Sequence, residues 1–94
     1  MNEHVRVSRS KATELDLSGT FIRRTDLSGA NLEKADLSNA DCTNVNFRGA
    51  NFKDADLTGT ILTGADLTGA MNLTQEQLDR AVVDKSTTLP DYIR

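Results

Sequence analysis

Between Leu17 and Leu67, every fifth residue of the chain is apolar. On an α-helix, five residues turn through about 500°, so successive apolar side chains would lie about 140° apart and form no stripe. On a flat strand, an odd spacing would place successive side chains on opposite faces. Only a backbone that bends once per five-residue unit keeps all of them inside, which predicts an all-β solenoid. The apolar centres are Leu17, Ile22, Leu27, Leu32, Leu37, Cys42, Phe47, Phe52, Leu57, Leu62 and Leu67.

The other positions of the unit follow the same period. Small or modest side chains stand two residues before each centre, where they point the same way on a strand and are expected to face inward. Nine of the eleven residues just before a centre are Asp or Asn, and the exceptions are Phe21 and Ile61. All six glycines stand two residues after a centre, at a position that Asn39, Asn44 and Asp54 share. Because Gly, Asn and Asp tolerate left-handed backbone best, this position is predicted to be the corner.

Units such as Gly29–Leu32 and Thr63–Gly69 resemble the pentapeptide-repeat family, and eleven of them occupy residues 15–69. The resemblance implies a right-handed quadrilateral β-helix with four units per coil, and therefore about three coils. At about 4.8 Å between stacked strands, these coils would be roughly 13 Å long. Residues twenty apart in the sequence would then lie in one column.

The chain is expected to divide into three segments. Residues 1–14 form an N-terminal strand or cap, residues 15–69 form the β-helix, and residues 70–94 form a C-terminal helical cap and tail, since both ends of a solenoid need a cover. In the first segment, Val5 and Val7 match the inward positions of the repeat. This segment could add a degenerate coil, or it could be an edge with which a partner pairs.

A short capping α-helix is predicted after the last repeat. Thr74 is the expected N-cap, and Gln77, three residues later, completes a capping box. Leu78, Ala81 and Val82 form a short apolar stripe that is expected to lie over the last coil.

Composition indicates a single small domain of 94 residues with a net charge of −3. No run of eighteen apolar residues and no basic-then-apolar leader is found, so we expect a cytoplasmic protein without a membrane segment. The lone Cys42 stands at an inward position, where it acts as a small apolar residue and needs no redox role.

Two surface features are candidate sites. The first is an acidic strip, because Asp16, Asp36 and Asp56 are twenty residues apart and would stack in one column. Such a strip could attract a basic partner or a cation. The alternative is that each carboxylate accepts hydrogen bonds from the backbone of its own turn.

The second feature is a candidate interface around the two exceptions to the Asp/Asn rule. Phe21 and Ile61 are forty residues apart and would share a column roughly 10 Å apart, with Arg23 and Arg24 beside Phe21. Exposed apolar side chains flanked by arginines are typical of a small interface. The alternative is that the terminal segments fold back and cover them.

No catalytic constellation, cofactor motif or metal-ligand spacing is found, so we expect no enzyme activity and no cofactor. The sequence favours an interaction or structural module whose protein partner is unknown, with a second copy in a homodimer as one candidate. The alternative is a DNA mimic that modulates DNA gyrase or topoisomerase, as longer members of the family do. Residues 15–69 carry eight acidic and five basic residues, and the predicted rod is too short to follow a duplex. We expect no nucleic acid binding, because no basic stripe forms.

Overall fold

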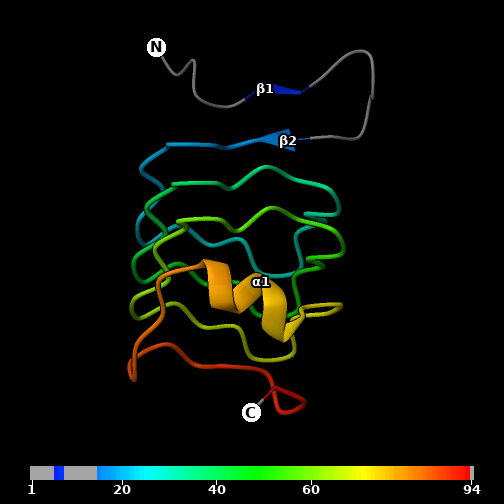
Figure 1. Ribbon diagram of the computed structural model, residues 1–94, viewed down its shortest axis with the longest axis vertical. Helices are drawn as coiled ribbons and strands as arrows, with labels where there is room; N and C mark the ends of the chain where they lie inside the picture. The colour runs from blue at the N-terminus through cyan, green and yellow to red at the C-terminus, as the bar shows by residue number, and fades with distance from the viewer. Residues whose placement is uncertain (1–5, 8–14, 94) are drawn as a thin grey trace.

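The computed structural model describes residues 6–7 and 15–93. From residue 15 onward, the chain completes a circuit of four short edges about every twenty residues (Figure 1). Parallel backbone bridges join successive circuits in four columns, which we call walls 1 to 4. The bridged residues are Asp16, Asp36 and Asp56 in wall 1; Phe21, Asp41, Ile61 and Val82 in wall 2; Asp26, Asn46, Asp66 and Thr88 in wall 3; and Asn31, Asn51 and Met71 in wall 4.

Each unit uses its backbone polar groups in two ways. Within a wall, the N–H of Leu17 donates to the carbonyl of Asp36 at 2.8 Å, and the same pattern recurs along the stack. Around each corner, the residue three positions after a centre donates back to it, as Thr20 does to Leu17 at 3.2 Å. Neighbouring circuits therefore satisfy the groups that one bent strand could not satisfy alone.

The predicted corner position adopts left-handed backbone. Gly49 has a φ of +71°, and the other five glycines are similar. Arg24 and Lys34 occupy the same position with φ values of +61° and +62°, although neither residue type favours this conformation. The fold thus imposes the corner on every unit, whichever residue stands there.

Nine of the eleven apolar centres are buried in the core, as predicted, whereas Ile22 and Leu27 in the first coil are only partly buried and pack against it. Leu37 and Leu57 are buried, and the rings of Phe47 and Phe52 meet edge to face with centroids 5.1 Å apart. Cys42 is fully buried, and this desolvation raises the pKa of its thiol to about 12. The thiol therefore stays protonated and packs as an apolar group.

The N-terminal end carries a short antiparallel pair. Strand β1 (Arg6–Val7) pairs with β2 (Leu15–Asp16), and Val7 stands opposite Leu15 (Figure 1). A further coil of the solenoid would pair in parallel, so the expectation of a degenerate coil is wrong for this strand. The alternative, that this N-terminal segment is an edge with which a partner pairs, stays a prediction; β1 itself pairs with the chain's own β2. Val5 lies outside the described residues.

The C-terminal segment begins with α1 (Gln75–Arg80), which has the predicted capping box between Thr74 and Gln77. Leu78 is buried against the core, and Ala81 packs beside it. The expectation for Val82 is wrong: this residue bridges Ile61 at the end of wall 2, and its side chain is half-exposed. Among the described residues, no helix has the length and apolar content that crossing a membrane requires.

Candidate functional site

The outward Asp and Asn residues serve their own turns. In each of the nine repeats that have one, its Oδ1 accepts the backbone N–H of the residue two positions later, at 2.9–3.1 Å. This is the Asx turn that these residue types favour. Where the later residue is Ser or Thr, its hydroxyl often donates as well, as Thr43 does to Asp41 at 2.6 Å. These hydrogen bonds stabilise the ionised carboxylate, so the pKa of Asp41 lies below 3.8.

The acidic strip of wall 1 follows this local pattern. Ser18 and Ser38 each donate twice to the aspartate two residues before them, and the N–H of Thr58 donates to Asp56 at 3.0 Å. The bonds from Thr58, helped by the charge of Arg80, lower the pKa of Asp56. Within the part of the chain that the structure describes, no group of three His, Cys, Asp or Glu side chains could hold a metal ion. The geometry of the strip therefore matches the turn role.

Wall 2 is where the Asx turn is missing. Phe21 and Ile61 carry no side-chain oxygen, so the N–H groups of Arg23 and Thr63 lack the bond made in the other nine repeats, and no other bond to them is found among residues 15–93. The structure brings both residues into one column, separated by Asp41. The two repeats that give up this local hydrogen bond thus lie on the same wall.

The side chains of wall 2 are accessible. Phe21 is 83% exposed, so no described residue folds back over it, and Ile61 is partly exposed. Val82 adds a third apolar side chain, 50% exposed, directly after Ile61 in the column. The five-residue period does not predict Val82, because α1 interrupts the count. Counting about one full circuit beyond Ile61 would have found it.

Two arginines lie at the Phe21 end of wall 2. The Nε of Arg23 is 3.8 Å from the Oδ2 of Asp41, and the Arg23 side chain is 56% exposed. Arg24 stands at the corner, is exposed and has no ion pair within residues 15–93. Arg23, Arg24 and Asp41 together carry a net charge of +1, so this end of the wall presents net positive charge.

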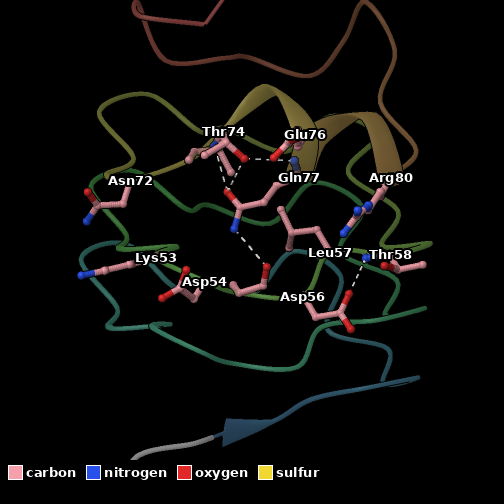
Figure 2. A pocket seen from close by; sticks show the side chains of 12 residues that line it. Lys53, Asp54, Asp56, Leu57, Thr58, Asn72, Thr74, Glu76, Gln77 and Arg80 are labelled. Carbon is pink, nitrogen blue, oxygen red and sulfur yellow. Dashed lines mark hydrogen bonds between the residues drawn. The ribbon is translucent and has the colours of Figure 1, made fainter.

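A separate cleft of about 670 Å³ lies where α1 meets walls 1 and 4 (Figure 2). Its lining includes the cations Lys53 and Arg80 and the carboxylates of Asp54, Asp56 and Glu76. None of the described residues that line it is His or Cys, so these residues offer no pairing of a nucleophile with a histidine base. The mixture of charges also gives no clear preference for an anion or a cation.

Within this cleft, Gln77 forms a structural contact between α1 and the solenoid. Gln77 reaches from α1 into the cleft (Figure 2). Its Nε2 donates to the carbonyls of Phe52 and Ala55 at 2.8 and 3.0 Å. Its Oε1 accepts the N–H of Thr74 at 2.8 Å. The amide of Gln77 therefore has two roles. It caps α1, and it donates hydrogen bonds to backbone carbonyls at the end of the solenoid, where a further coil would otherwise have paired.

The sequence profile described as Pentapeptide repeats matches residues 8–41 and 35–75 with eight copies, so the chain belongs to the pentapeptide-repeat family. Members of this family fold as right-handed quadrilateral β-helices, in agreement with the four walls. No protein with curated annotation matches the chain significantly.

Several solved structures resemble the chain. The pentapeptide repeat protein Rfr23 from the cyanobacterium Cyanothece 51142 is 31% identical, with a TM-score of 0.68 over 78% of this chain and 49% of its own. The protein alr5209 from Nostoc PCC 7120 is also 31% identical, with a TM-score of 0.57 over 81% of this chain and 71% of its own. HetL from the same Nostoc strain, involved in heterocyst differentiation regulation, is 25% identical, with a TM-score of 0.53 over 83% of this chain and 45% of its own. The chain thus spans about half the length of Rfr23 and HetL.

Proposed function

We propose that the protein is a non-catalytic interaction module that binds a protein partner through wall 2. In this proposal, about three coils form a rigid body in the cytoplasm, α1 and the tail of residues 70–94 cap one end, and residues 1–14 cover the other. The carrying observation is that the two repeats without an Asx turn lie on one wall, where Phe21 is exposed.

The energetics favour a role outside the fold. A local hydrogen bond contributes about 0.5–1.5 kcal/mol to stability, and the repeats of Phe21 and Ile61 both lack it. Phe21 recovers little of it in the monomer, because an 83% exposed ring removes little apolar surface from water. A partner that covers the ring would supply the missing stabilisation, and aromatic side chains commonly anchor interfaces.

The relatives support this class of function. HetL is involved in regulating a differentiation process, and a module that acts by contact is one way in which a repeat protein regulates. A DNA mimic has less support here, because about three coils are too short to follow a duplex and arginines flank wall 2.

Site-specific photo-crosslinking in the cells that encode the protein tests the proposal. We would replace Phe21 with p-benzoylphenylalanine, and use the same replacement at Asn31, an exposed residue at the equivalent repeat position of wall 4, as the control. The proposal predicts a discrete adduct from position 21 and none from position 31. An adduct of twice the chain's mass would identify the partner as a second copy. Equal labelling at both positions, or none at position 21, would exclude wall 2 as the contact.

A further inference from the structure

We propose that the partner contributes an amphipathic α-helix, which lies along wall 2 parallel to the solenoid axis and places acidic side chains beside Arg23 and Arg24. This inference rests on the proposed function of wall 2. It adds the secondary structure, direction and charge of the bound segment.

The spacing of the apolar side chains matches a helix. Phe21 and Ile61 are two rungs apart and Ile61 and Val82 are one rung apart, which corresponds to about 9.6 and 4.8 Å. A helix rises 1.5 Å per residue, so side chains at i, i+7 and i+10 are separated by about 10.5 and 4.5 Å along its axis. In an extended segment, side chains on one face repeat about every 6.6 Å, which fits neither interval. The column therefore matches the heptad-like pattern of an amphipathic helix.

The shape of the wall sets the direction of this helix. Each wall is a strand of about three residues, roughly 10 Å wide, which is about the diameter of one helix. The apolar column runs across the strands, along the stack. A helix parallel to the stack would therefore contact Phe21, Ile61 and Val82 together, whereas a helix parallel to the strands would contact only part of the column.

Asp41, between Phe21 and Ile61 in the column, limits which residue of the bound helix can lie over it. The side chain of Asp41 is only 18% exposed, and its Oδ1 accepts both the N–H and the hydroxyl of Thr43. Asp41 therefore presents little side-chain surface between Phe21 and Ile61. A small or polar residue three or four positions after the helix residue that contacts Phe21 fits this rung best.

The charges indicate which end of the helix is acidic. Arg23 and Arg24 lie at the Phe21 end, and Asp41 is the one carboxylate near them on the described part of the wall. At the other end, Asp84 and Lys85 follow Val82 with one charge of each sign. Complementarity thus requires Asp or Glu beside the residue that contacts Phe21, where such charges set register and association rate.

A phage-displayed library of random 20-residue peptides tests the inference. Selection would use the full chain, with counter-selection on the double variant Phe21→Asn/Ile61→Asn. Asn already stands at this repeat position in other units, so the variant suits the fold. We expect enriched peptides with apolar residues at i, i+7 and i+10 or i+11, acidic residues near i, and helical circular dichroism when bound. The double variant should weaken their binding at least tenfold.

A charge variant and its matched control complete the test. Arg24→Gly removes the charge at a left-handed corner that glycine fits, and should weaken binding several-fold at low salt. Lys34→Gly makes the same change at another corner and should leave binding unchanged. Selected peptides that need Phe21 and Ile61 but are extended or basic would overturn the helix inference and leave the proposed function intact. Peptides that bind the double variant equally well would contradict both, and the absence of any enriched peptide would also overturn the helix inference.

Discussion

The joint between α1 and the solenoid depends on one side chain, and its removal has a calculable effect. Gln77→Leu deletes a long bond of 3.4 Å from the hydroxyl of Thr74 and three shorter hydrogen bonds: the one from the N–H of Thr74 to Oε1, and the two from Nε2 to Phe52 and Ala55. At about 1 kcal/mol for each shorter bond, the loss is about 3 kcal/mol. Thr74→Ala removes the hydroxyl that accepts the N–H of Gln77 at 3.1 Å, which costs about 1 kcal/mol. The difference of about 2 kcal/mol corresponds to the two bonds from Nε2, because each variant also loses one bond of the capping box.

Urea unfolding followed by far-ultraviolet circular dichroism would measure both variants. In a domain of this size, 3 kcal/mol corresponds to a fall in Tm of roughly 12–24 °C. Hydrogen exchange at Gly59 gives a local reading, because its N–H donates to the carbonyl of Arg80 at the end of α1. Gln77→Leu should accelerate this exchange more than Thr74→Ala does. If the two variants have equal free energies of unfolding, the bonds from Nε2 contribute nothing and the reasoning is refuted.

Three further predictions concern the core, the corners and the carboxylates. Leu57→Ala should cost about 2–4 kcal/mol in urea unfolding, and a loss below 1 kcal/mol would contradict the proposed register. Gly59→Ala should destabilise the fold more than Gly69→Ala, because the new Cβ would collide with Oδ1 of Asn39 only at position 59. Adding Asn39→Gly should abolish this difference in stability. A difference that persists would show that the collision with Asn39 is not its cause. Five aspartates with a lowered pKa stabilise the fold above about pH 3.8, and this contribution is lost as the pH falls through their folded values; a free energy of unfolding that is unchanged between pH 5 and pH 2.5 would contradict this. They are Asp26, Asp41, Asp56, Asp66 and Asp84.

The sequence predicted the features that its five-residue period specifies directly. Nine of the eleven predicted buried centres and the left-handed glycine corners are found in the structure, and of the two alternatives for the outward aspartates the structure matches the Asx role, because each of these features follows from one side chain in one repeat. The capping box of Thr74 and Gln77 is equally local. The column that joins Phe21 to Ile61 also follows from the period, once the resemblance supplies four units per coil.

The remaining features depend on contacts between distant segments. The direction of β1 is set by its pairing with β2 rather than by its own residues. Val82 joins wall 2 only because α1 ends where the chain re-enters the ladder. Arg24 and Lys34 adopt left-handed backbone because neighbouring circuits fix the corner, against the preference of both residues. The Gln77 contacts with Phe52 and Ala55 likewise arise only when α1 packs on the wall.

The free energy of unfolding of Phe21→Asn/Ile61→Asn tests most directly whether wall 2 serves a partner or the fold. Asn at these positions can form the Asx turns that Arg23 and Thr63 lack, at about 0.5–1.5 kcal/mol each, while Ile61, which is partly exposed, loses some apolar contact. We therefore predict that urea unfolding of the double variant gives a free energy within about 1 kcal/mol of the parent value, or above it. A loss of more than about 2 kcal/mol would show that these side chains stabilise the monomer, and would contradict their assignment to a partner surface.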